Sequence, residues 1–284
     1  MDKKLLINLV PGDTFLHKLN GKSKVQLFLL AIIFYIASWD MRYLVPATII
    51  SFIAFLTTKP RWKTIEFLVW FMLISNLLNF FLLWLVEPNY GVHFADTTTK
   101  LVTFSSRYFL SRETLWYFAV RFMKFIGTFL VSLTFVMTIT PSQFAAGLNA
   151  IHVPYKVCTI VSLALRYIPE IQRDFMTIRV SMQCRGMELD SRKEKFWKRV
   201  KENAMILLPL VVTSFERVTN IANAMDLRGY GKKKKRTYYS EPFPTKWDHL
   251  ANVVAFILLA FLIWYIAEYK FIHVPKYSIW NPWN

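Results

Sequence analysis

Five apolar runs alternate with polar stretches along the chain, and each run is predicted to form a helix that spans a membrane. The runs cover residues 25–39, 43–57, 65–86, 115–139 and 250–267. A helix needs about 20 apolar residues to cross the hydrocarbon core of a bilayer, so the first two runs are near the short limit. Only Asp40, Met41 and Arg42 separate these two, which predicts a tight helical hairpin.

Between the fourth and fifth runs, an amphipathic helical pattern occurs twice at an interval of 43 residues. In each copy, apolar positions are spaced by four, three, four, three and four residues, which places them on one face of an α-helix. The face consists of Ala164, Ile168, Ile171, Phe175, Ile178 and Met182 in the first copy, and of Leu207, Val211, Ser214, Val218, Ile221 and Met225 in the second. We therefore predict two helices of about six turns each. They pack face to face or lie together against a membrane surface.

Both copies end in an arginine followed by a glycine, Arg185-Gly186 and Arg228-Gly229. A cation in the last turn interacts favourably with the helix dipole, and glycine commonly ends a helix in the left-handed conformation, so one such pair is an ordinary cap. A duplicated helix with a duplicated end indicates docking into two similar partners. A guanidinium suits that role because it stays charged and bridges carboxylates or carbonyls.

Composition and charge place these helices in a membrane protein. Of the 284 residues, 55% are hydrophobic and 19% are charged, which is typical of a polytopic membrane protein. The net charge of +17 would suggest nucleic-acid binding in a soluble protein. Here, however, lysine and arginine concentrate in residues 1–24, 57–64 and 140–247 and are sparse in the other connections. This alternation follows the positive-inside rule, so the rich segments face the cytoplasm and nucleic acid is not the partner.

The remaining sequence indicates no catalytic or metal site. Gly21-Lys22-Ser23 imitates the end of a phosphate-binding loop, but Leu16 stands where that motif requires glycine, so no nucleotide pocket is predicted. The five histidines are scattered without the spacing of metal ligands, and no Ser/His/Asp or paired-carboxylate pattern is visible. Cys158 and Cys184 both fall in the predicted cytoplasmic region and imply no disulfide framework.

Several polar residues inside the predicted helices have structural interpretations. Asn76 and Asn79 share a face of the third span, and their amide side chains are expected to form hydrogen bonds to a neighbouring helix. Arg121 and Lys124 lie close enough to the outer interface for their side chains to reach it. Charged residues off the apolar faces of the repeated helices are predicted to form a solvated face, with partner contact as the alternative. They are Glu170, Arg173, Asp174, Glu216 and Arg217.

Three features of the chain resemble the transmembrane T component of energy-coupling factor (ECF) transporters, importers of vitamins and metals that are related to ABC transporters. Residues 11–20 resemble the family's opening segment. Residues 181–186 (Ser-Met-Gln-Cys-Arg-Gly) and 224–229 (Ala-Met-Asp-Leu-Arg-Gly) resemble its paired Ala/Ser-x-x-x-Arg-Gly signatures. Four spans, long cytoplasmic helices and a last span follow in the family's order. Cys184 and Leu227 replace the family's frequent alanine but remove neither an arginine nor a glycine.

The resemblance implies an all-α polytopic protein of the bacterial plasma membrane, with about five transmembrane helices, long cytoplasmic amphipathic coupling helices and a cytoplasmic N-terminus. The expected regions are a membrane region with four spans (1–139), a cytoplasmic coupling-helix region (140–247), and a last span with an external tail (248–284). The apolar faces would pack the coupling helices and form a platform for a separate membrane S component that binds the vitamin. The packing residues are Ile168, Ile171, Phe175, Ile178, Val211, Ser214, Val218 and Ile221.

The resemblance also implies that the ends of the coupling helices lodge in two cytoplasmic ABC ATPases. The residues concerned are Ser181, Met182, Arg185, Gly186, Ala224, Met225, Arg228 and Gly229. ATP and Mg²⁺ would be bound by the ATPases, and this chain would bind no cofactor. The two ends are unequal, with Cys184 against Leu227 and Met187 against Tyr230, which favours two different ATPases.

One alternative from another class is a polytopic membrane enzyme whose basic cytoplasmic region collects an anionic lipid or nucleotide substrate. Such an enzyme needs acidic or histidine residues that converge at the membrane surface, and its activity would persist without partner proteins. The predicted cytoplasmic helices carry mostly cations. The sequence therefore favours a non-catalytic transporter subunit.

Overall fold

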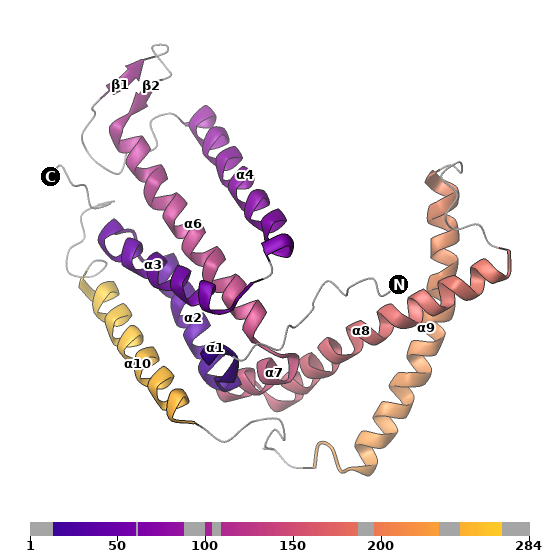
Figure 1. Cartoon of the computed structure of the whole chain (residues 1–284). Helices are drawn as coiled ribbons and strands as arrows, with labels where there is room; N and C mark the ends of the chain where they lie inside the picture. The colour runs from indigo at the N-terminus through magenta and orange to yellow at the C-terminus, as the bar shows by residue number, and fades with distance from the viewer. Residues whose placement is uncertain are drawn as a thin grey trace. The chain divides into compact units, whose positions relative to one another are not determined.

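The computed structural model describes residues 14–60, 62–87, 100–103, 109–186, 196–232 and 245–268. The chain divides into two compact units. The first, the membrane unit, contains α1 to α4, the strands β1 and β2, α6 and α10 (Figure 1). The second, the crossed-helix unit, contains α7, α8 and α9. Residues 11–13 of the opening segment, Met187, and the predicted tail beyond residue 268 lie outside the described residues.

The membrane unit is a bundle of helices that follows the five apolar runs of the sequence. Its helices are α1 (Phe15–Lys18), α2 (Gly21–Ala37), α3 (Met41–Thr57), α4 (Trp62–Val86), α6 (Arg112–Thr138) and α10 (Lys246–Ile266). Residues 38–40 join α2 to α3, which confirms the tight hairpin. Each of these two helices has 17 residues, and α3 is a shorter apolar helix. Residues 65–86 of α4, all of α6 and all of α10 are long and apolar enough to span a membrane.

Residues 204–227 of α9 also meet this criterion of length and composition. They belong to the second repeated helix, which the sequence predicts to be cytoplasmic. The apolar content of this helix is therefore higher than that prediction implies. Together these helices confirm an all-α polytopic membrane protein.

Two short strands add one feature to the predicted all-α fold. The strands β1 (Lys100–Thr103) and β2 (Phe109–Ser111) pair antiparallel, with Lys100 opposite Ser111. They lie in the polar connection between the third and fourth spans. Ser111 also caps α6, because its hydroxyl accepts a hydrogen bond from the Thr114 N–H at 3.2 Å. The hairpin thus leads directly into the fourth span.

The core of the membrane unit lies where α3 and α2 pack on α6 and where α10 packs on α2. Its buried residues are Phe34, Tyr35, Leu44, Tyr117, Phe118, Val120 and Leu262. One contact depends on a glycine, because a Cβ atom at Gly127 would lie 2.1 Å from the Tyr35 ring. The Tyr35 hydroxyl in turn bonds the Ser51 hydroxyl at 3.0 Å. Gly127 therefore allows α2 and α6 to approach closely.

Buried polar groups join the start of α2, the start of α10 and the end of α6. The Asp248 carboxylate accepts hydrogen bonds from the Asn20 N–H (2.7 Å), the Thr245 N–H (2.8 Å) and the Thr245 hydroxyl (2.8 Å). The Lys24 ammonium donates to the carbonyl of His17 at 2.9 Å and to that of Thr138 at 2.8 Å. His17 and Asn20 belong to the opening segment. That segment therefore has a structural role, which the sequence did not reveal.

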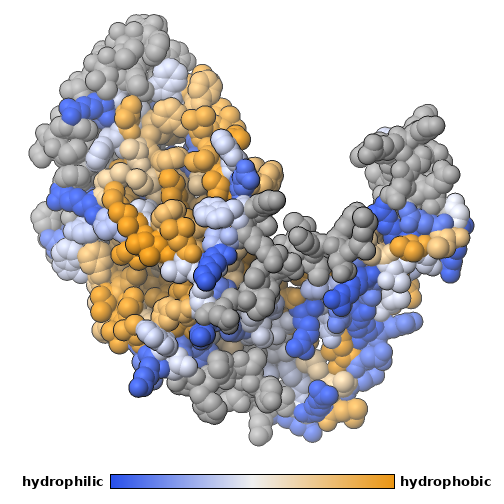
Figure 2. Space-filling view, in the orientation of Figure 1, coloured by the Kyte–Doolittle hydropathy of each residue, from blue (hydrophilic) through white to orange (hydrophobic). Residues whose placement is uncertain are grey.

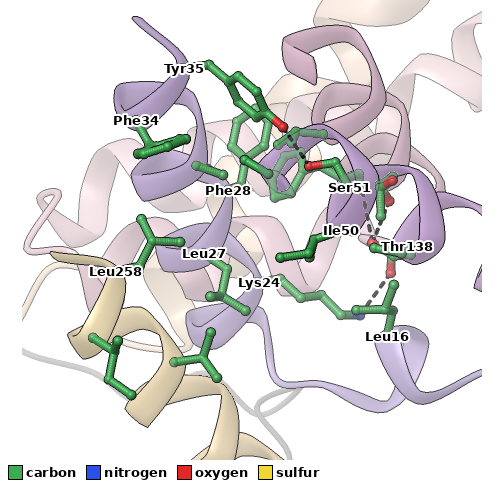
Figure 3. Close-up of a pocket in the computed structure, with 18 of the residues that line it drawn as sticks. Leu16, Lys24, Leu27, Phe28, Phe34, Tyr35, Ile50, Ser51, Thr138 and Leu258 are labelled. Atoms are coloured by element: carbon green, nitrogen blue, oxygen red, sulfur yellow. Dashed lines mark hydrogen bonds between the residues drawn. The ribbon is translucent and has the colours of Figure 1, made fainter. Parts of the chain in front are cut away.

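An apolar pocket of about 570 Å³ lies among α2, α3, α6 and α10 (Figure 3). Side chains such as Leu27, Phe28 and Ile50 line it, and Lys24 lies at one end with its ammonium turned to Thr138. The exposed surface of the unit is also apolar, as the orange areas of Figure 2 show. On α4, Leu77 is 71% exposed. Such a surface is stable when lipid covers it.

The crossed-helix unit consists of a short helix and two long ones. They are α7 (Pro141–Ala150), α8 (Tyr155–Cys184) and α9 (Phe196–Leu227). With 30 and 32 residues, α8 and α9 are longer than the predicted six turns. The helix α8 packs on both α7 and α9.

Candidate coupling site

The ends of α8 and α9, here called the tips, are built in the same way. Gly186 and Gly229 both adopt the left-handed conformation, with φ of 89° and 66°. The Gly186 N–H donates to the carbonyl of Gln183 at 3.0 Å, and the Gly229 N–H donates to that of Asp226 at 2.9 Å. At the second tip, the Tyr230 N–H also donates to the carbonyl of Met225 at 2.9 Å, which completes a Schellman motif. The glycines are therefore helix caps.

The arginines contribute their backbone to the caps and present their side chains to the surroundings. The Arg185 N–H donates to the carbonyls of Ser181 (3.2 Å) and Met182 (3.1 Å), and the Arg228 N–H donates to the carbonyl of Ala224 (3.2 Å). Both arginine residues are exposed. A Cβ atom at Gly186 would meet nothing within 4 Å, so backbone conformation, and not space, explains this glycine. Each tip thus holds a guanidinium beyond a firmly capped helix end.

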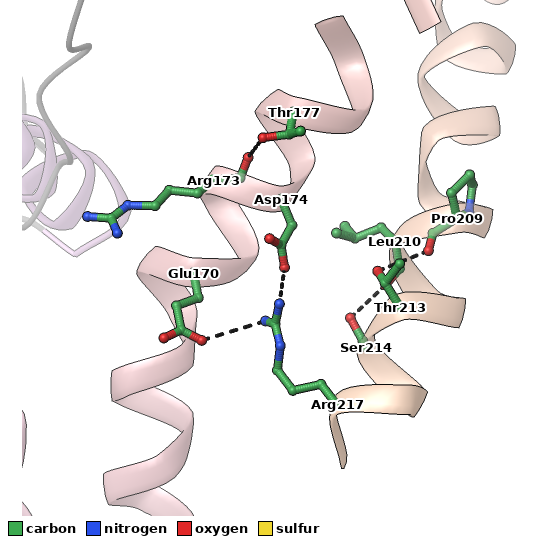
Figure 4. Close-up of polar contacts among 9 residues, drawn as sticks. All are labelled: Glu170, Arg173, Asp174, Thr177, Pro209, Leu210, Thr213, Ser214 and Arg217. Atoms are coloured by element: carbon green, nitrogen blue, oxygen red, sulfur yellow. Dashed lines mark hydrogen bonds and ion pairs between the residues drawn. The ribbon is translucent and has the colours of Figure 1, made fainter. Parts of the chain in front are cut away.

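The two long helices cross (Figure 1), and the ion pair at the crossing joins equivalent positions of the repeat. At the crossing, the Arg217 guanidinium donates to the Asp174 carboxylate at 2.5 Å (Figure 4). Asp174 and Arg217 are 43 residues apart, the interval of the repeat, and each lies eleven residues before the arginine of its tip. The tips therefore extend by equal lengths from the crossing, about 16 Å each at the rise of an α-helix.

The charged residues near the crossing correct one sequence prediction. Arg217 also lies 3.8 Å from the Glu170 carboxylate and over the Tyr167 ring, 5.9 Å from its centroid. Arg217 thus pairs with Asp174 and Glu170 across α8 and α9, which the solvated-face prediction did not include. Arg173 and Glu216 are exposed, in keeping with that prediction. Arg173 points away from the crossing in Figure 4. The sequence contained a signal for this pairing, because Asp174 and Arg217 occupy equivalent positions of the repeat and carry opposite charges.

The apolar faces of α8 and α9 remain largely exposed. Ile168 is 41% exposed, Val211 is 48% exposed and Val218 is 60% exposed. The other half of the two faces is partly buried, namely Phe175, Ile178, Met182, Ser214, Ile221 and Met225. Helices that cross touch over a short length, so part of each face extends beyond the contact.

The polar residues in the third and fourth spans contact their own helix in one case and a distant segment in another. The Asn76 amide donates to the sulfur of Met72 at 3.5 Å, within its own helix and not to a neighbouring one as predicted. Asn76, Asn79 and Arg121 line a groove of about 500 Å³ between α4 and α6. Lys124 donates to the carbonyl of Ile36 at 3.0 Å, and its ammonium lies 3.8 Å from the centroid of the Trp39 ring.

Comparison with known proteins shows the family to which the chain belongs. The family model of the cobalt transport protein CbiQ matches residues 12–239. The chain belongs to this family. The chain is also similar to energy-coupling factor transporter transmembrane proteins named EcfT. The protein from Streptococcus thermophilus is 26% identical, with 94% of this chain and 99% of the relative covered.

Two further relatives carry the same name. The protein from Lactococcus lactis is 28% identical over 93% of this chain and 97% of its own length, and that from Listeria innocua is 27% identical over 84% and 89%. These matches confirm the resemblance to the ECF T component along most of the chain. Together with the apolar helices, they identify a multi-pass membrane protein of a transport family. Because these relatives are named as transporter components, the comparison favours a transport role over the enzyme alternative.

Proposed function

We propose that this chain is the energy-coupling transmembrane scaffold of an ECF-type ABC importer. In this proposal, two cytoplasmic ATPases bind and hydrolyse ATP, and each ATPase receives one tip of the crossed pair. Motion of the ATPases is passed through α8 and α9 to a membrane S component that carries a vitamin or another micronutrient. This chain performs no catalysis and binds no cofactor.

The observation that carries the proposal is the twin tips on two helices that cross at equivalent points. A helix end that is capped through glycine keeps its last turn intact, because carbonyls of that turn are hydrogen-bonded. An exposed guanidinium at that end suits a site that offers carboxylates or carbonyls in a fork geometry. Two such ends at equal distances from a crossing match a pair of similar partners.

The partners and the topology follow from the same proposal. The exposed faces of α8 and α9 would be covered by the S component. The unequal residues at the tips, Cys184 and Leu227, favour two different ATPases. Region 140–247 would lie in the cytoplasm together with the N-terminus, between the membrane region 1–139 and the last span and tail, 248–284.

Co-purification from membranes tests the proposal directly. The wild-type chain in mild detergent is expected to bring down ABC ATPases, identified by mass spectrometry, and the complex is expected to hydrolyse ATP. The double variant Arg185→Glu, Arg228→Glu should lose the ATPases, because each carboxylate would repel the acidic groups that an arginine pocket presents. Arg173→Glu is the matched control, since Arg173 is an exposed cation on α8 away from the tip.

Protein recovered in the membrane fraction serves as the folding control for all variants. If the double variant retains the ATPases and their ATP hydrolysis like the wild type, the arginines act as helix caps and the coupling function is wrong. Single variants show whether the two tips contribute equally, and mass spectrometry of the recovered ATPases distinguishes a pair of identical ATPases from a pair of different ones.

A further inference from the structure

The crossing holds one cation between two anions that occupy successive turns of the same helix. Glu170 and Asp174 are four residues apart on α8, so their carboxylates lie on one face, one turn from each other. The Arg217 guanidinium contacts Asp174 through Nη2 at 2.5 Å and lies near Glu170 through Nη1 at 3.8 Å. Figure 4 shows the guanidinium between the two carboxylates. The close partner is therefore Asp174, and Glu170 is a second position within reach.

Both ion pairs are accessible enough to exchange. The exposed fractions of the side chains are 30% for Arg217, 33% for Asp174 and 48% for Glu170. Water screens such pairs, so moving from one carboxylate to the other does not leave a buried charge without a partner. One guanidinium therefore lies between two carboxylates that are both partly exposed.

The backbone next to the crossing is suited to bending. Pro169 in α8 directly precedes Glu170, and Pro209 lies in α9 eight residues before Arg217. A proline inside a helix removes one backbone hydrogen bond and favours a kink. In α9, the Ser214 hydroxyl donates to the carbonyl of Leu210 at 2.6 Å, and the Thr213 hydroxyl donates to that of Pro209 at 3.1 Å. Such bonds from hydroxyl to backbone also promote bending.

We propose that Arg217 is a positioning residue that steps between Asp174 and Glu170 as α8 and α9 pivot. Each carboxylate defines one arrangement of the crossing: the guanidinium is close to Asp174 in one, as observed, and closes the 3.8 Å gap to Glu170 in the other. The step changes the separation of the tips while the guanidinium keeps an anionic partner. This inference rests on the proposed function for its role in transport, but the two arrangements are a property of the chain itself.

The tips offer equivalent positions for a distance measurement. Cys184 is exposed beside Arg185, and Leu227, 43 residues later, is 89% exposed beside Arg228. Spin labels on Cys184 and on Leu227→Cys, in a chain with Cys158→Ser, report the separation of the tips by pulsed electron spin resonance. The purified full-length chain is measured first, followed by the complex with its ATPases, with and without ATP.

The two carboxylate variants are expected to act in opposite directions. Asp174→Asn leaves Glu170 as the charged partner, and Glu170→Gln leaves Asp174, so each variant should favour a different separation. The population ratio should change about fivefold, in keeping with the strength of a partly exposed ion pair. Arg217→Gln should give the same distribution whichever carboxylate is present. Glu216→Gln and Arg173→Gln, next to the interacting residues, are the matched controls and should resemble the wild type.

Charge reversal separates pairing from a loss of packing. The double variant Asp174→Arg, Arg217→Asp keeps an ion pair only between positions 174 and 217, so it should give the separation that Glu170→Gln favours, whereas either single reversal should broaden the distribution. If Asp174→Asn and Glu170→Gln shift the distances in the same direction, or not at all, the two-position inference is wrong. If they act oppositely in the chain alone but ATP does not change the distances in the complex, the coupling function fails while the two positions stand.

Discussion

The membrane unit and the crossed-helix unit both expose large apolar side chains. They differ in the contacts that hold their helices together. In the membrane unit, exposed residues of α4 and α10 surround a buried core that includes Tyr35 and Leu44. In the crossed-helix unit, α8 and α9 cross where a charged group, Arg217, contacts Asp174. In the membrane unit, lipid alone can cover the exposed apolar side chains. The second presents faces and tips that suit other proteins, and this difference can be tested.

The largest effect should separate the two kinds of exposed surface. Leu77 on α4 is 71% exposed and Val218 on α9 is 60% exposed. An aspartate near the centre of a spanning helix costs about 2.5–3.5 kcal/mol. Leu77→Asp should therefore strongly reduce the amount of chain that resists alkaline extraction from membranes, whereas Val218→Asp should leave it unchanged.

Leu77→Ala and Val218→Ala control for the loss of the side chain. Equal losses from the two aspartate variants would place the face of α9 in lipid as well. The apolar content of residues 204–227 would then mark a further span, and the distinction between the units would fail.

The next effect concerns the close approach of α2 and α6. Gly127→Ala would place a methyl group 2.1 Å from the Tyr35 ring, which is buried and hydrogen-bonded to Ser51. Overpacking of this kind costs about 1–3 kcal/mol, so the midpoint of thermal unfolding in detergent should fall. Val136→Ala, at a 60% exposed position of α6, is the control. An unchanged midpoint for Gly127→Ala would mean that the helices separate easily.

A smaller effect is expected where α10 begins. Asp248→Ala removes the acceptor of three hydrogen bonds, from the N–H groups of Asn20 and Thr245 and from the Thr245 hydroxyl. Losing a helix cap of this type costs about 0.5–2 kcal/mol. The thermal midpoint should fall by less than for Gly127→Ala. His249→Ala, at the exposed next residue, should match the wild type, and an equal fall in both variants would exclude the capping explanation.

The smallest effect on stability should occur at the tips. Gly186→Ala forces a methyl-bearing residue to φ of 89°, which costs about 1 kcal/mol locally. The cost lies at the end of α8, so the thermal midpoint should hardly change, while ATPase co-purification should weaken. Gly231→Ala has a similar φ of 88° beyond the second tip and controls for strain alone. Equal binding by Gly186→Ala and wild type would show that the shape of the cap is not needed.

Much of the candidate site follows from local pattern. The spacing of apolar residues predicted the helical character of α8 and α9, and the Arg-Gly pairs marked where these helices end. Such features depend on residues a few positions apart, which sequence displays directly. The pairing of Asp174 with Arg217 was missed, because a pair 43 residues apart forms only if two helices cross at that point. The shared anchoring of Asn20 and Thr245 by Asp248 was missed for the same reason.

By itself, the sequence determined the fold class, the apolar helices and the two glycine-capped tips, because side-chain periodicity and backbone conformation act over a few residues. Only the tertiary structure decided which polar groups meet, since contacts such as Arg217 with Asp174, Lys24 with Thr138, and Gly127 with Tyr35 depend on where distant helices approach. The effect of a side chain's charge or size at such a contact can be inferred only when the residue that it contacts is known. The helices therefore follow from residues that are close in the sequence, whereas the crossing depends on contacts between residues that are far apart in it.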